Sequence, residues 1–140
     1  MSNILYPKAK ESLLSAGINL LTDNIKAVLV DTTVGSNPYT LDSANHEFLS
    51  DIPANSRIST TANFTGKTVL NGVFDADDTQ FPSVPAGDAA EAYVIYKDTG
   101  VEATSRLIAY IDTATGLAVS PDGNNINVTF DSGVNKIFAL

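Results

Sequence analysis

AYVIYKDTGVEATSRLIAYIDTATG, the stretch at residues 92–116, decides the fold. It contains two short runs, residues 92–96 and 107–111, that are rich in Val, Ile and Tyr and apolar at nearly every position. Such runs are too short for buried helices, and their residue types favour strands. Polar segments at residues 98–100 and 113–116 follow the two runs and are expected to be turns. The pattern predicts two central strands that are covered on both faces.

Shorter strands are expected on both sides of this central pair, because turn residues recur at roughly every eight to twelve positions. Threonine and valine are abundant, which is typical of a sandwich or barrel. The expected strands are residues 25–30, 57–61, 64–70, 72–74, 79–81, 126–130 and 136–138. Asn71 and Gly72 are expected to form a two-residue hairpin turn between two of them.

Two helices are expected beside the strands. The first spans residues 7–16, with a proline in its first turn and Gly17 placed to end it. The second is a short loop helix over residues 44–49, capped by Asp42 or Ser43. The sequence therefore predicts an α+β, β-rich fold: an antiparallel sandwich or barrel-like domain with an N-terminal helix and a short loop helix.

Length and composition indicate one domain over residues 1–140, large enough to bury its own core. There is no run of about 18 apolar residues to predict a membrane span, and the first residues lack the pattern of a signal peptide. Cysteine is absent, which excludes disulfides, thiolate nucleophiles and sulfur-ligated metals. Synthesis and folding in a reducing cytoplasm are therefore expected.

The net charge of −8 is distributed unevenly along the chain. Residues 71–131 carry ten acidic and two basic side chains, which accounts for the whole net charge. Nucleic-acid binding needs clustered Lys and Arg to neutralise phosphates, and anionic membranes attract the same residues. Neither nucleic acid nor a membrane is therefore expected as a partner. An acidic surface does keep a protein soluble at high local concentration.

Few residues suggest catalysis or metal binding. His46 is the only histidine, and the serines near it in sequence do not make a nucleophile–base pair, so a helix-surface or capping role is expected. Asp75, Asp77 and Asp78 could offer oxygens to Ca²⁺, but EF-hand spacing fails and a turn explains them equally well. The sequence predicts no catalytic residue, no metal site, no cofactor and no enzymatic activity.

Two other sets of residues leave a carbohydrate-related function open. Glu91 and Glu102 could form a pair of glycosidase carboxylates, although their separation in space is not fixed by the sequence. Tyr93, Tyr96 and Tyr110 could stack on sugars, but at strand spacing they are expected to fill the core.

Several stretches of the chain resemble, in the same order, a family of small structural proteins of tailed bacteriophages. The similar stretches are LYPKAKESLLSAGINLLTDNIKAVLVDT from residue 5, HEFLSDIPANSRI from residue 46, GVFDADDTQFPSV from residue 72, YKDTG from residue 96, SRLIAYIDTATGLAV from residue 105 and NKIFAL from residue 135. The chain departs from the family at residues 35–39, where the loop looks longer, and at Ala118, where the family often has proline.

Membership of this family implies a virion component. The resemblance implies a head decoration or cement protein that lies on the capsid surface after synthesis in the host cytoplasm. Its expected partners are the major capsid protein and further copies of itself, with a homotrimer favoured. The alternative is a tail- or fibre-associated structural protein that binds the host.

Both chain ends are apolar, which is unusual for frayed termini. The first six residues precede a proline that begins the helix, so they cannot belong to it. Ile4, Leu5 and Tyr6 are the candidate partner contacts, either with a neighbouring protomer or with the capsid, and docking within the same protomer stays open. The C-terminal residues 137–140 are expected to form the last strand of the chain's own sheet.

Overall fold

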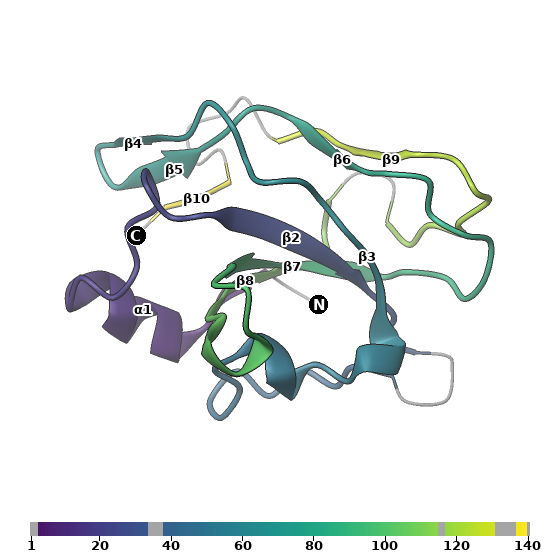
Figure 1. Ribbon diagram of the computed structural model, residues 1–140, viewed down its shortest axis with the longest axis horizontal. Coiled ribbons are helices and arrows are strands. Elements are labelled where there is room, and N and C mark those ends of the chain that lie inside the picture. Colours follow the sequence, from purple (N-terminus) through teal and green to yellow (C-terminus); the bar gives the residue numbers. More distant parts are fainter. Residues whose placement is uncertain (1–2, 34–37, 115–116, 131–136, 140) are drawn as a thin grey trace.

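A computed structural model describes residues 3–33, 38–114, 117–130 and 137–139 of the chain. Within these ranges the protein has ten strands in antiparallel sheets and one α-helix, with three short 3₁₀ turns (Figure 1). This architecture confirms the α+β, β-rich class that the sequence predicts.

The centre of the fold is a five-stranded antiparallel sheet with the order β1-β8-β7-β2-β3. Its strands are β1 (Ile4–Leu5), β2 (Ile25–Val30), β3 (Arg57–Thr60), β7 (Ala92–Lys97) and β8 (Leu107–Ile111). Every residue of β8, and all but the last residue of β7, is buried. The two apolar runs are therefore neighbouring strands covered on both faces, as expected. Because the side chains of β7 and β8 are apolar on both faces, these strands are stable only where other layers cover both sides of the sheet.

Two smaller sheets form a layer over one face of the five-stranded sheet (Figure 1). One has the order β10-β5-β4, and the other pairs β6 with β9. Their strands are β4 (Thr68–Leu70), β5 (Val73–Asp75), β6 (Thr79–Phe81), β9 (Ile126–Val128) and β10 (Phe138–Ala139). The layers meet through aromatic side chains, and the ring of Phe81 lies 6.3 Å from that of Tyr93.

The helix α1 (Pro7–Leu14) and the 3₁₀ turns cover the opposite face (Figure 1). These turns are η1 (Leu49–Asp51), η2 (Ala54–Ser56) and η3 (Glu102–Thr104). Under them lies a second set of buried side chains, including Tyr6, Tyr39, Ile52 and Tyr110. The central sheet is thus sandwiched between an all-β layer and a layer of helix and loops.

The prediction of a loop helix over residues 44–49 is wrong. The chain makes a turn there, and η1 begins only at Leu49. The carboxylate of Asp51 accepts the backbone N–H groups of Glu47 at 2.8 Å and Phe48 at 3.0 Å. Such local side-chain bonds give the backbone an alternative to helical pairing.

Other boundaries also differ from expectation. The first helix ends at Leu14 rather than at residue 16, because Ala16 adopts a left-handed conformation with φ of 65°. The single strand expected over residues 64–70 is reduced to β4, because Gly66 turns the chain with φ of +62° and packs under the carboxylate of Asp77. A side chain at Gly66 would require the Asp77 carboxylate to move and would strain the backbone at this positive φ, so glycine is favoured.

The turn at Asn71 and Gly72 is confirmed. Both residues have positive φ, at 53° and 79°, and Leu70 pairs with Val73 across the turn. These are the backbone angles that a two-residue hairpin of this type requires. The last strand is described as β10, and residue 136, where it was expected to begin, lies outside the described residues.

Candidate partner-binding site

The N-terminal residues form one edge of the central sheet. Ile4 pairs with Tyr110 and Leu5 with Ala109, so that β1 lies antiparallel to β8. The ladder continues as Tyr6 donates its N–H to the carbonyl of Ile108 at 3.0 Å. Ile4 and Leu5 are half-buried, so part of each side chain remains at the surface.

Tyr6 differs from its two neighbours because its side chain is wholly buried. Its hydroxyl forms a 2.7 Å hydrogen bond with that of Tyr39, which lies 2.9 Å from Nδ1 of His46. Burial raises the pKa of Tyr6 far above its ordinary value and that of Tyr39 to about 12. Tyr6 therefore holds its own chain together and offers no side-chain surface to a partner. Partner contact through Ile4 and Leu5 stays a prediction.

His46 does not lie on a helix, contrary to expectation. It occupies the loop before η1, where its ring stacks on that of Tyr39 with centroids 5.3 Å apart. Its Nδ1 also accepts the backbone N–H of Asp42 at 3.3 Å. These contacts hold the loop that contains His46 against the buried tyrosines.

Ile4 and Leu5 line a groove of about 360 Å³ beside β1. The other described lining residues are Asn3, Lys10 of α1, Ala109 and Ile111 of β8, and residues 137–139. The sequence did not indicate this groove, since it is built from segments more than a hundred residues apart. The apolar character of both chain ends was the only signal that could have pointed to it.

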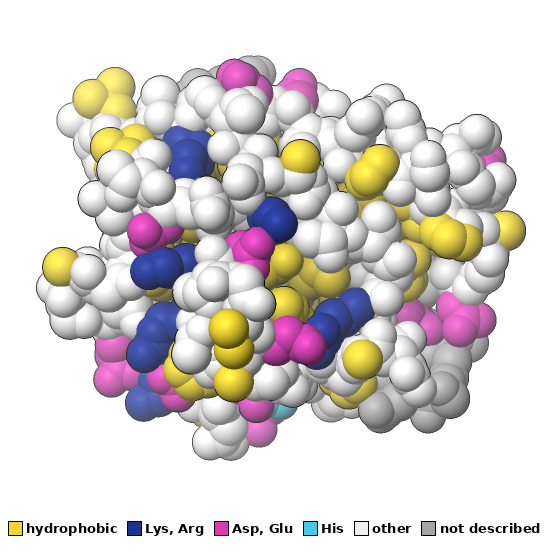
Figure 2. Space-filling model, viewed as in Figure 1, with side chains coloured by type: hydrophobic (Ala, Val, Ile, Leu, Met, Phe, Trp, Pro, Cys, Tyr) yellow, Lys and Arg dark blue, Asp and Glu magenta, His cyan; other side chains and the backbone are white. Residues whose placement is uncertain are grey.

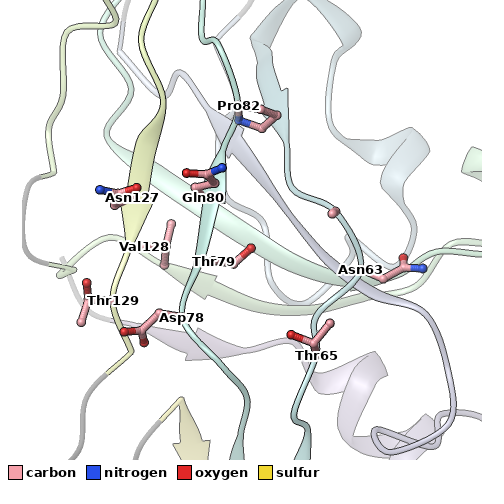
Figure 3. A pocket seen from close by; sticks show the side chains of 10 residues that line it. Asn63, Thr65, Asp78, Thr79, Gln80, Pro82, Asn127, Val128 and Thr129 are labelled. Carbon is pink, nitrogen blue, oxygen red and sulfur yellow. The ribbon is translucent and has the colours of Figure 1, made fainter.

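A second groove, of about 660 Å³, lies beside the β6–β9 ribbon. Figure 3 shows Gln80 and Asn127 next to each other on the ribbon, with Asn63 and Thr65 on the facing segment. Six of its ten lining residues carry amide or hydroxyl side chains, and the described lining contains no histidine, lysine, arginine or aromatic residue. This groove can form hydrogen bonds with a polar ligand, and Asp78 is the one carboxylate in its described lining.

The aspartates near this groove hold loops together. Asp77 accepts the hydroxyl proton of Thr65 at 3.2 Å, and its own N–H donates to the carbonyl of Thr65 at 2.8 Å. Asp78 accepts the backbone N–H of Phe130 at 2.9 Å. In the part of the chain that the structure describes, no three histidine or acidic side chains come together as metal ligands would.

Glu91 and Glu102 each have a partner of their own. Glu91 lies directly before β7, and Glu102 lies in η3, in the connection from β7 to β8. Glu91 accepts the N–H of Thr32 at 2.7 Å, and Glu102 pairs with Arg57. Tyr93, Tyr96 and Tyr110 are all buried and fill the core as expected.

Asp112, directly after β8, is in an unusual environment. Both of its carboxylate oxygens are shielded from solvent and have no hydrogen-bond partner among the described residues, and no other described side chain has such an atom. Its backbone N–H donates to the side chain of Asn3 at 3.0 Å, which ties the end of β8 to the residue before β1. A buried, unpaired carboxylate is costly.

Charges on one face of the molecule are locally balanced, as Figure 2 shows by the proximity of basic and acidic side chains. Lys26 pairs with Asp98 at 2.9 Å, and hydrogen bonds from Lys26 and from Gly100 hold the pKa of Asp98 below its usual value. Arg57 pairs with Glu102. Lys26 and Arg57 therefore neutralise two acidic side chains of the stretch 71–131 within the fold.

Among the described residues, no helix is both long and apolar enough to span a bilayer. Comparison of the sequence with protein-family models and with curated proteins found no match.

Proposed function

We propose that this chain is a structural component of a tailed-bacteriophage virion, a decoration or cement protein that binds the outer surface of the major capsid protein lattice. The observation that carries the proposal is the resemblance to small phage structural proteins, which runs in one order along most of the chain. The half-buried edge strand β1 and the apolar groove beside it provide a surface suited to binding.

Binding through such a surface needs no catalysis. Self-association, with a trimer favoured, would let joined protomers engage neighbouring capsid subunits at once. Each single contact can then be weak, because linked binding events proceed at a high effective concentration. We expect the purified chain to turn over no ester, glycoside or nucleotide, and any turnover abolished by His46→Ala would contradict the proposal.

The decisive experiment measures copy number in purified virions of the phage that encodes the chain. Quantitative mass spectrometry should find a copy number similar to that of the major capsid protein. Purified chain added to particles that lack it should bind until its sites on the capsid are saturated, as measured by co-sedimentation with the particles. A copy number far below that of the capsid protein would assign the chain to the tail instead.

The polar groove in Figure 3 favours the tail- or fibre-associated alternative, because amide and hydroxyl side chains can bind the hydroxyl groups of a host glycan. Gln80 and Asn127 have no other hydrogen-bonding role among the described residues that would compete with such a ligand. This function would be supported if the purified chain binds host cells, if Gln80→Ala weakens that binding, and if the copy number in virions is low.

A further inference from the structure

Two open strand edges face the groove beside β1. In the central sheet β1 is the outermost strand, and in the three-stranded sheet β10 is the outermost strand. Residues of both strands line the same groove. The two sheets therefore come close at this seam without pairing.

The backbone of β1 is oriented to accept another strand. In an antiparallel ladder, consecutive residues turn their N–H and C=O alternately toward the paired strand and away from it. Because the N–H of Tyr6 bonds to Ile108 of β8, the N–H and C=O of Leu5 point away from β8. A strand edge with unpaired backbone groups is a ready template for a further strand.

The lining of the groove defines the chemistry of a suitable ligand. The described lining includes Ile111, which is 6% exposed, and the partly buried Ile137. Lys10 is the charged residue of this lining, and none of the described acidic side chains pairs with it. The neighbouring Lys8 of α1, in contrast, pairs with Glu11 at 3.2 Å. The described lining thus offers several apolar side chains, an open backbone edge and the positive charge of Lys10.

We infer that this groove binds an extended segment of another protein, which adds as a strand along β1 between the two sheets. The segment is apolar at alternate positions and carries a carboxylate that pairs with Lys10. Charge complementarity selects an acidic segment, and the described ends of this chain are already paired within their own fold, so a different protein supplies it. The inference goes beyond the proposed function, because it depends only on the groove.

The test uses a displayed library of random peptides of about eight residues, a typical strand length, selected against the full-length chain. Selected peptides should alternate apolar residues and include Asp or Glu. Lys10→Gln should weaken the best peptide about fivefold, as expected for loss of an exposed ion pair. Its matched control, Lys8→Gln on the same helix, should leave affinity unchanged.

Leu5→Pro probes the backbone directly. It removes the outward N–H and breaks no hydrogen bond of the β1–β8 ladder, so the fold should persist by NMR while peptide affinity falls about tenfold. Amide exchange at Leu5 should slow when the peptide binds. If Leu5→Pro does not fold, the inference is still tested by the comparison of Lys10→Gln with Lys8→Gln and by the amide-exchange measurement on the natural chain.

Three results would overturn the inference. The library could yield no binder, or the bound peptide could protect the β6–β9 ribbon and ignore Lys10→Gln. Ultracentrifugation of the chain alone could show a dimer that Lys10→Gln dissociates, which would make a second copy the occupant. None of these results changes the copy number in virions, so failure here is distinguishable from failure of the proposed function.

Discussion

The central sheet and the layer above it use the same residue types in different ways. In β7 and β8 almost every residue is buried, because helix and loops cover one face and the small sheets cover the other. In β4 all three residues are exposed, and Leu70 retains 71% of its surface. Burial from both sides therefore makes the central sheet the main source of stability, and the upper layer depends on fewer contacts.

The aromatic residues divide between the two regions. All five tyrosines lie in or against the central sheet: Tyr6, Tyr39, Tyr93, Tyr96 and Tyr110. The upper layer instead packs phenylalanines in pairs, with Phe64 5.4 Å from Phe130 and Phe74 5.3 Å from Phe138. Tyrosine needs a place for its hydroxyl when it is buried, whereas phenylalanine does not. The buried phenol groups, and the dependence of stability on alkaline pH that they cause, therefore belong to the central sheet.

The largest expected effect is a difference in the free energy of unfolding when the same substitution, Leu to Ala, is made in each of the two regions. Leu107→Ala in β8 removes a fully buried side chain and leaves a cavity, so it should lower the free energy of unfolding by about 2–5 kcal/mol. Leu70→Ala in β4 removes an exposed side chain and should change it by about 0.5 kcal/mol or less. Urea denaturation of both variants measures the difference. Similar losses would show that the upper layer contributes equally to stability.

The central strands could be predicted because their signal is local. A continuous apolar run such as β8 indicates a buried strand wherever the rest of the chain lies, and the turn at Asn71 and Gly72 depends on two residues alone. The loop before η1 could not be predicted, because the carboxylate of Asp51 redirects the backbone. The groove beside β1 could not be predicted either, since the packing of two separate sheets brings Ile4 and Ile137 to one groove.

The second effect concerns alkaline pH. Burial raises the pKa of Tyr93 from 10 to about 12. Above pH 10 the unfolded chain loses this proton while the folded chain keeps it. The associated stability is therefore complete below pH 10 and is lost as pH rises toward about 12. The loss should approach about 3 kcal/mol.

Urea midpoints measured across this range for the natural chain and for Tyr93→Phe provide the test. The variant should lose stability less steeply with pH, because it has no phenol to ionise at this position. Parallel curves for the two proteins would show that the other buried tyrosines, or the lysines, account for the alkaline loss.

A smaller effect of opposite sign is expected at Asp112. Its carboxylate oxygens are shielded from solvent and have no hydrogen-bond partner among the described residues, so Asp112→Asn removes a charge that these residues leave uncompensated while keeping the shape. The free energy of unfolding at pH 7 should rise by about 1 kcal/mol. Asp98→Asn is the matched control, because it removes a carboxylate that pairs with Lys26 and should not stabilise. A loss of stability in Asp112→Asn would mean that the carboxylate has a favourable role in the fold.

The smallest effect compares two buried tyrosines on opposite faces of the central sheet. Tyr6→Phe removes the hydroxyl that lies 2.7 Å from that of Tyr39, and the lost hydrogen bond should cost about 1 kcal/mol at pH 7. Tyr93→Phe removes a hydroxyl for which the described residues provide no partner, so at pH 7 it should be nearly neutral. Urea denaturation distinguishes the two. Equal losses would contradict the view that hydrogen bonding under the loop, rather than burial of the rings alone, fastens the N-terminal strand to the sheet.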